Sequence, residues 1–396
     1  MKPENQPDHR PDWIEQATLR SLEDQAARSG VEVTEAMQAE VARSLVEAAA
    51  GELAQRFADE VVGSMYGFLD DRKHAQTGFE ARLDAIWGKA FDLLEAMIAC
   101  SIDFGIEFHR AEQAAAAAEN DPVFEAVTRL HARACRIALE ILTLMRSGHA
   151  MGAMGRFRSL EEIVIVALFI RQQGRETAEH YLRHGLATQW RVAKEQNTHS
   201  AALGMTPHTE GELDQLKVIR DRLVETFDQP CFDSDYGWAL TAMGRECSTA
   251  AHASSRARSH RVTFAEIEKK VDFDQYRPYV RLASRAIHAD SAAFYWDIGL
   301  GDAGQEVMFY GRANDGFSYP ASLTAHLIGL MTICLVLIRA ETVERLMQAS
   351  GIMKLRDPLG AALAAAEREI SDRKKYTAPE STLVSPASSE GHDAAD

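Results

Sequence analysis

The segment from Leu323 to Ile338, LTAHLIGLMTICLVLI, decides the fold class of this chain. It is apolar on nearly every face of a helix, which is typical of a helix that is buried in a protein core or crosses a membrane. The segment is shorter than the roughly 20 residues that are needed to span a bilayer. It therefore predicts the buried central helix of a protein that makes no contact with a membrane.

Helical periodicity extends outward from this segment over almost the whole chain, and alternating, strand-like runs are scarce. The pattern predicts an all-α fold, a multi-helix bundle of about ten helices. We expect helices over residues 12–28, 34–69, 74–118, 124–147, 153–172, 176–203, 212–227, 263–271, 275–296, 318–349 and 358–375. The stretches 229–261 and 299–320 are expected to be irregular loops.

The motif Asn120-Asp121-Pro122 is the best candidate for a domain boundary, because it combines a helix stop with a proline that can start the next helix. The long helices before it favour contact with other proteins, and we expect a homodimer. The predicted regions are an N-terminal helical extension (1–120), a helical-bundle core (121–350), a C-terminal helix (351–376) and a disordered acidic tail (377–396).

Composition limits the classes of function. The formal net charge of −16 argues against a protein that coats nucleic acid through its overall field, although it leaves a local basic groove open. Five cysteines without metal-ligand spacing predict reduced thiols, and the polar N-terminus lacks the apolar core of a signal peptide. Both observations indicate a cytoplasmic protein.

Several classes of enzyme leave sequence motifs that this chain does not contain. It has no phosphate-binding loop of the G-x-x-x-x-G-K-[ST] type, no dinucleotide-binding glycine motif after a strand and no G-x-S-x-G motif. It also has neither an H-E-x-x-H motif nor the paired Glu-x-x-His motifs of a di-iron site. We therefore expect no metal and no cofactor.

A polar stripe lies on the predicted helix 278–296, PYVRLASRAIHADSAAFYW. Spacings of three, four and seven residues place five side chains on one face of a helix. These are Arg281, Ser284, Arg285, His288 and Ser291. Such a stripe is either solvated or directed into a polar site.

A second group of polar residues lies between 150 and 184. Arg158 and Glu162 are four residues apart, so they can form an ion pair on one helix face beside the apolar run Ile163–Ile170. Tyr181 and His184 follow on the next predicted helix. A structural ion pair is the favoured interpretation of Arg158 and Glu162 when they are taken alone.

The segment 245–261, RECSTAAHASSRARSHR, is the most basic part of this acidic chain. One interpretation is a loop that contacts the phosphates of RNA or of a nucleotide. The other is a solvated linker whose arginines pair with the surplus Asp and Glu, which the lack of aromatic residues for base stacking favours. The candidate phosphate ligands are Arg245, Arg256, Arg258 and Arg261.

Three runs resemble an uncharacterised bacterial family, the domain of unknown function 5677. They are RFRSLEEIVIVALFIRQQ (156–173), AEHYLRH (178–184) and RPYVRLASRAIHADSAAFYWDIG (277–299). The similarity covers roughly residues 129–349 and implies a helical fold without naming a reaction. The family motifs match this sequence at Arg158, Glu162, Tyr181, Ser284 and His288.

Arg281 and His288, with six residues between them, are similar to the arginine–histidine signature of the HEPN superfamily. This resemblance implies a dimeric, metal-independent endoribonuclease of an anti-phage or stress system, with a regulatory protein partner. His288 would be the general acid and base and Arg281 the phosphate ligand. Ser284 and Arg285 would support them.

Two hypotheses of different classes therefore remain open. The first is a phosphate-directed effector, and specifically a ribonuclease that binds RNA in a local basic groove. The second is a non-enzymatic binding or sensor module, in which the polar residues form a buried network or hold a small ligand. Catalysis requires Arg281 and His288 to line a cleft, whereas a structural role requires them to be enclosed and hydrogen-bonded.

Overall fold

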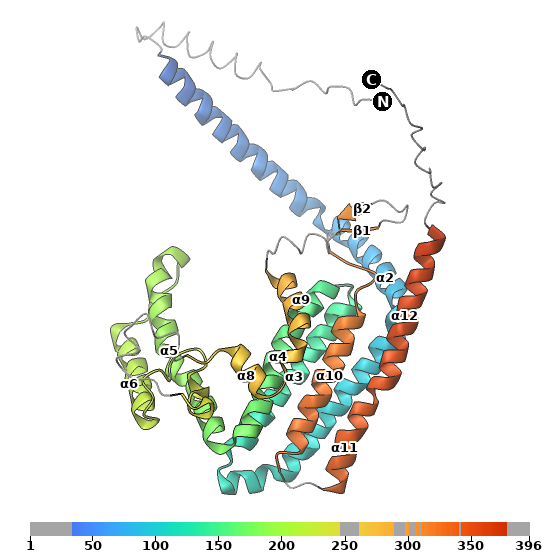
Figure 1. Ribbon diagram of the computed structural model, residues 1–396. Helices are drawn as coiled ribbons and strands as arrows, with labels where there is room; N and C mark the ends of the chain where they lie inside the picture. The colour runs from blue at the N-terminus through green and yellow to red at the C-terminus, as the bar shows by residue number, and fades with distance from the viewer. Residues whose placement is uncertain are drawn as a thin grey trace, which may run out of the picture. The chain divides into compact units, whose positions relative to one another are not determined.

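The computed structural model describes residues 34–245, 261–288, 298–300, 306–308, 311–339 and 342–377. These residues form an all-α protein, as predicted (Figure 1). The predicted helix 12–28 and the acidic tail from residue 378 onward lie outside this part of the chain. The described residues divide into two compact units on either side of Phe79 and Glu80, within a helix, and the domain boundary at residue 120 stays a prediction.

Most predicted helices are present with small shifts at their ends. The main helices are α2 (Glu35–Glu119), α3 (Pro122–Arg146), α4 (Ala150–Gln173), α5 (Arg175–Leu203), α6 (Glu210–Thr226), α8 (Phe264–Lys270), α9 (Arg277–Ile287), α10 (Ser318–Val336), α11 (Val343–Lys354) and α12 (Arg356–Thr377). Single 3₁₀ turns are η1 (Gly237–Ala239), η2 (Thr241–Met243) and η4 (Asp274–Tyr276).

Helix α2 is one continuous helix where the sequence pattern predicts two. The apolar periodicity fades over residues 70–73, but these residues include neither proline nor glycine, so nothing interrupts the backbone hydrogen bonds. The stop at Asn120 is confirmed. The Asp121 carboxylate accepts hydrogen bonds from the backbone N–H groups of Val123 and Phe124, and Pro122 begins α3.

The predicted helix 318–349 is divided into α10 and α11. Thr342 is extended and its hydroxyl accepts a hydrogen bond from the backbone N–H of Arg345, which starts α11 as a new helix. The predicted loop 299–320 also differs, because β1 (Ile298–Leu300) and β2 (Glu306–Met308) pair as an antiparallel ribbon.

Helix α9 ends at Ile287, well before the predicted end at Trp296. Its antiparallel neighbour is α4, since Ser284 contacts Arg158 and Ile287 lies against Gly155 near the beginning of α4. Because α4 begins at Ala150, it extends for only about one further turn beyond that contact, too short to support α9 as far as Trp296. Propensity alone rarely holds a helical turn without packing.

The predicted core helix is α10, which packs against α3, α4, α11 and α12 (Figure 1). In the described part of the chain it is the one helix that is long and apolar enough to cross a membrane, and 72% of its apolar window is buried inside the protein. Beside it, the Trp87 indole N–H donates to the carbonyl oxygen of Asn314 (2.9 Å), and the Trp87 ring packs edge-on against Phe317.

The prediction that the cysteines are reduced thiols is correct for three of them and wrong for one. Cys100, Cys135 and Cys334 are free, whereas Cys231 is bonded in a disulfide. A disulfide requires two Cβ atoms within about 4 Å of one another, and sequence spacing does not disclose that distance.

Candidate functional site

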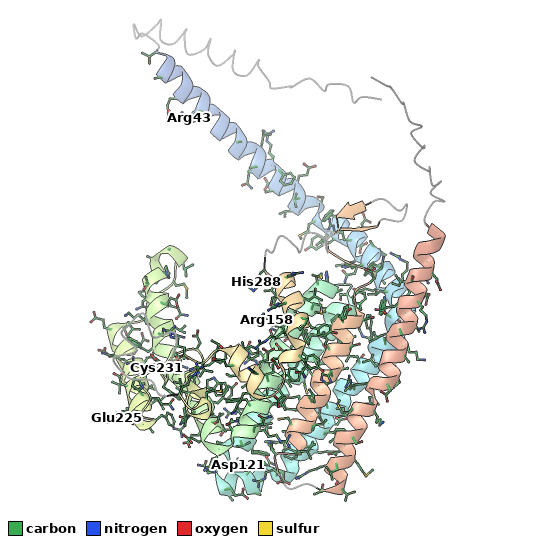
Figure 2. The ribbon with its side chains drawn as sticks, viewed as in Figure 1. Arg43, Asp121, Arg158, Glu225, Cys231 and His288 are labelled. Carbon is green, nitrogen blue, oxygen red and sulfur yellow. The ribbon has the colours of Figure 1, made fainter. Side chains whose placement is uncertain are left out.

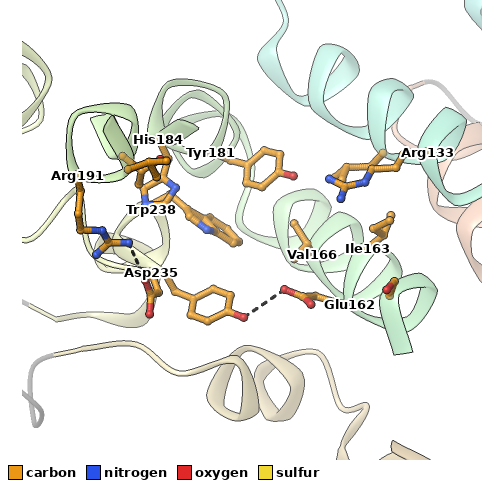
Figure 3. A pocket seen from close by; sticks show the side chains of 14 residues that line it. Arg133, Glu162, Ile163, Val166, Tyr181, His184, Arg191, Asp235 and Trp238 are labelled. Carbon is orange, nitrogen blue, oxygen red and sulfur yellow. Dashed lines mark hydrogen bonds and ion pairs between the residues drawn. The ribbon is translucent and has the colours of Figure 1, made fainter. Parts of the chain in front are cut away.

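A pocket of about 540 Å³ opens between α3, α4, α5 and the segment that leads into η1 (Figure 3). This volume lies within the range of roughly 300–1,000 Å³ that is typical of small-molecule sites. Its walls are mixed, with apolar side chains beside several charged and hydroxyl groups. The lining residues are Leu130, Arg133, Ser159, Glu162, Ile163, Val166, Tyr181, His184, Thr188, Arg191, Val192, Asp235, Tyr236 and Trp238.

Two helices present their pocket residues through ordinary helical spacing. On α4, Ser159 and Glu162 share a face with Ile163 because they are three and four residues apart. On α5, Tyr181 and His184 share a face for the same reason. One stripe of each helix therefore faces the pocket, and the rest of α4 is free to be buried in the core.

The third wall is the segment from Cys231 to Leu240, which has little regular structure but is firmly packed. Phe232 and Trp238 are buried, and the Trp238 ring contacts Phe169 and Tyr181 edge-on. At Gly237 an added Cβ would lie 2.2 Å from the carbonyl oxygen of Phe232, so only glycine fits.

His184 attaches this wall to α5. Its Nε2 atom donates a hydrogen bond of 2.8 Å to the carbonyl oxygen of Ser234, which can only accept. Burial lowers the pKa of His184, so the ring is neutral at physiological pH. The role of His184 is thus to position the wall of the pocket.

Tyr236 and Glu162 form the polar end of the pocket. The Tyr236 hydroxyl donates to the Glu162 carboxylate over 3.2 Å (Figure 3). Burial, with the Glu162 charge as a second cause, raises the pKa of Tyr236, so the phenol keeps its proton and remains a donor. Glu162 is itself exposed, so its carboxylate is accessible to a ligand.

Arg133 and Tyr181 supply the unused hydrogen-bonding groups. Within the described residues, neither the Arg133 guanidinium nor the Tyr181 hydroxyl forms a hydrogen bond or an ion pair, and the Tyr181 ring extends toward Arg133 (Figure 3). Burial raises the pKa of Tyr181, and the charge of Arg133 opposes that rise. By contrast, Arg191 is engaged with Asp235 at 2.9 Å.

The structure thus gathers Glu162, Tyr181 and His184 from the predicted site residues. Arg158 does not pair with Glu162 as the spacing suggested. Its guanidinium donates to the Ser284 hydroxyl and links α4 to α9, whereas Glu162 is bonded to Tyr236. A spacing of four residues permits an ion pair, but each of the two side chains is hydrogen-bonded to a residue of another element.

Helix α9 carries Arg281, Ser284 and Arg285 of the predicted stripe, and His288 caps its C-terminus, where the His288 backbone N–H donates to the carbonyl oxygen of Ser284 at 3.0 Å. Arg281 and Arg285 are exposed, and His288 follows the last residue of α9 with an extended backbone (Figure 2). Ser291 lies outside the described residues. The arginine–histidine signature that the HEPN resemblance implies for Arg281 and His288 stays a prediction.

The basic segment is only partly described. The Arg245 guanidinium donates to the Glu266 carboxylate and to the backbone carbonyl of Arg261, so it connects the loop to α8. Arg261 is exposed. Arg256 and Arg258 lie outside the described residues, and their predicted contact with phosphate stays a prediction.

A buried pair of glutamates was missed from the sequence. Glu161 on α4 is fully buried, and within the described structure neither of its carboxylate oxygens has a hydrogen-bond partner. Burial, followed by the charge of Glu268, raises the pKa of Glu161 to about 8. Glu268 on α8 is also buried and accepts a 2.7 Å hydrogen bond from Arg277.

The position of Glu161 in the sequence indicates that it is buried. It lies four residues after Phe157 and four before Ile165, within the apolar stripe of α4, whereas Glu162 lies four residues after Arg158. Among the described residues, no group of three or more His, Cys, Asp or Glu side chains is arranged to hold a metal ion.

The ribonuclease hypothesis makes a prediction that separates chemistry from stability. His288 is exposed and its side chain forms no hydrogen bond to the described residues, so His288→Ala is expected to change the free energy of unfolding by less than about 0.5 kcal/mol. RNA cleavage by both proteins in excess chelator is the measurement. Cleavage by the wild type that is absent in the variant would support catalysis by His288. No cleavage by the wild type would contradict it.

Comparison with known proteins gives a family without an assigned activity. Residues 124–305 match the model described as "Family of unknown function (DUF5677)". The matched segment contains every residue that lines the pocket. No curated protein and no solved structure matches the chain.

Proposed function

We propose that the protein, whose residues 124–305 match a family of unknown function, DUF5677, is a helical binding module. Its pocket between α3, α4 and α5 would hold a small organic anion. The observation that carries the proposal is the pair of unused groups, the Arg133 guanidinium and the Tyr181 hydroxyl, in a pocket of ligand size. A guanidinium binds carboxylate, sulfonate or phosphate oxygens through two parallel hydrogen bonds.

The rest of the lining supports an amphipathic ligand. Leu130, Ile163 and Val166 offer apolar contact, and the Trp238 ring borders the same space. At the other end, the Glu162 carboxylate accepts from Tyr236 and retains acceptor capacity for a ligand N–H or O–H group. The ligand therefore has an anionic group, a flat apolar body and a hydrogen-bond donor.

A pocket that binds an apolar ligand with one charged end suits a binding or sensor protein better than an enzyme. His184 is neutral and donates to Ser234, and Tyr236 is held as a donor, so neither is placed to take a proton from a substrate. Ligand binding would instead link α5 and the wall segment to α3, which changes the relative stability of these elements.

The anionic dye 1-anilinonaphthalene-8-sulfonate and its neutral analogue N-phenyl-1-naphthylamine test this proposal, because they share the aromatic rings and differ in the sulfonate. We expect Arg133→Gln to weaken binding of the sulfonate by about tenfold or more, as loss of a charge-assisted hydrogen bond costs about 1.5–3 kcal/mol. Binding of the neutral analogue should remain unchanged. Fluorescence titration measures both affinities.

The matched control is Arg129→Gln, one turn earlier on α3. Arg129 is exposed, pairs with Glu125 at 2.6 Å and does not line the pocket. This variant should bind the sulfonate as the wild type does. Equal loss in the two variants, or no loss in Arg133→Gln, would contradict the proposed site.

A further inference from the structure

The first unit of the protein, the part of α2 up to Phe79, exposes an unusual number of large apolar side chains. Tyr66 is 80% exposed, Phe57 69% and Leu53 65%. Among the side chains that the structure describes in this unit, the exposed large apolar ones are Leu53, Phe57, Val61, Val62, Tyr66, Phe68 and Leu69. Contiguous exposed apolar surface on a soluble protein marks a site of association.

These residues form a face of the helix. Leu53, Phe57 and Val61 are four residues apart, and Phe68 follows seven residues after Val61, so all four point to one side. Val62 and Leu69 lie about 100° and 80° further around the helix than Val61, so they border this face without belonging to it. We call the surface formed by Leu53, Phe57, Val61 and Phe68 the α2 apolar face.

The opposite side of the same helix carries Tyr66 and several polar side chains that bond to one another. The Gln55 side-chain amide donates to Asp59 at 2.9 Å, and His74 lies 3.7 Å from the Asp70 carboxylate. These are contacts between neighbouring turns, which a solvated helix surface makes without any partner. Apolar side chains make no such contacts, so the α2 apolar face gains stability from a cover.

The preceding residues of the chain are poorly suited to cover this face. The sequence predicts a helix over 12–28 that ends at Gly30. Folded back at Gly30, it would run beside residues up to about 50, because both helices rise about 1.5 Å per residue. Residues 1–11, MKPENQPDHRP, would be the ones to reach further, but they are polar and include three prolines.

We propose that a second copy of this chain covers the α2 apolar face, so that the protein dimerises through residues 53–69. Two side chains of the α2 apolar face, Phe57 and Phe68, are aromatic, and an aromatic side chain buries about 150–250 Å². Together with Leu53 and Val61 they supply a large part of the roughly 800 Å² that each partner buries in a stable complex. On a single helix this apolar surface stays in water and adds no stability. In a pair of helices the surface of each copy is buried against the other.

The full-length chain tests the proposal. By light scattering after size exclusion at micromolar concentration, the wild type should have twice the 43.8 kDa mass of one chain. Phe57→Glu with Phe68→Glu should have the mass of one chain, because each dimer would otherwise bury four carboxylates. A wild type with the mass of one chain, or a charged variant that stays dimeric, would overturn the proposal.

Two further variants separate association from folding. Gln55→Glu with Gly63→Glu adds the same charge to the polar side, where a Cβ at Gly63 meets nothing within 4 Å, and it should remain dimeric. Phe57→Ala with Phe68→Ala keeps or improves helix propensity, and it should raise the dimer dissociation constant at least about tenfold without loss of helical circular dichroism. An unchanged dissociation constant in the alanine variant would contradict the proposed interface.

Discussion

Replacing Glu161 by glutamine is expected to abolish a loss of stability that the wild-type protein suffers between pH 5 and pH 8. Glu161 is fully buried and its carboxylate has no hydrogen-bond partner within the described structure. Burial, followed by the charge of Glu268, raises its pKa from an ordinary 4.5 to about 8. Ionisation is therefore far more costly in the folded protein than in the unfolded chain.

The direction of the pH dependence follows from these two values. Below pH 4.5 Glu161 is protonated in both states and costs nothing. As the pH rises from 4.5 to about 8, the unfolded chain releases this proton while the folded protein retains it, so stability falls throughout that window. At about 1.4 kcal/mol per pH unit, the three units between pH 5 and pH 8 correspond to at most roughly 4 kcal/mol.

Urea unfolding of the wild type and Glu161→Gln at pH 5, 6.5 and 8 measures this difference. The two free energies should lie closest together at pH 5 and diverge toward pH 8, with the variant more stable. Glu225→Gln is the control, since Glu225 is exposed on α6 and its replacement should leave the pH dependence as in the wild type. Parallel pH profiles for wild type and Glu161→Gln would contradict the assigned burial of a protonated carboxyl group.

Gly237→Ala is expected to destabilise the pocket wall by about 3 kcal/mol and to abolish binding of the aromatic sulfonate. The added methyl group would lie 2.2 Å from the backbone oxygen of Phe232 and 2.6 Å from that of Cys231. Both obstacles are backbone atoms, so the chain itself must move, and overpacking of this kind costs typically 1–3 kcal/mol and sometimes more. Trp238, the next residue, would then lose its contacts with Phe169 and Tyr181.

Gly185→Ala on α5 is the matched control. Its added Cβ meets nothing within 4 Å, and the helical backbone accepts alanine, so this variant should gain about 0.5–1 kcal/mol. Thermal unfolding and dye titration of both variants measure stability and binding together. Wild-type affinity in Gly237→Ala would show that the wall segment is not part of the binding site.

Some helix boundaries of this fold follow from local sequence and can be predicted, whereas others depend on packing and cannot. The stop at Asn120 was predictable because Asp121 and Pro122 act on the first turn of the helix that they begin. The early end of α9 was not predictable in this way. The residues after Ile287 are compatible with a helix in sequence. The helix that supports α9 is α4, and it begins at Ala150, close to its contact with Ile287.

The residues of the candidate site likewise include some that the sequence identifies and some that it does not. Glu162, Tyr181 and His184 are identifiable from motifs, because they are polar residues at helical spacing beside apolar runs. Arg133 and Trp238 lie far from them in sequence, on α3 and in a segment that periodicity describes only as a loop. Nothing local distinguishes Arg133 from the other exposed arginines of α3.

The all-α class and the buried helix α10 follow from the amino-acid pattern alone, because apolar spacing is a property of neighbouring residues on one element. Three features of the site depend on the folded protein: which polar residues share a pocket, the hydrogen bond from Arg158 to Ser284 instead of Glu162, and the burial of Glu161 with no hydrogen-bond partner among the described residues. Those outcomes depend on distances between elements far apart in the chain, and side-chain partners and desolvation follow from these distances.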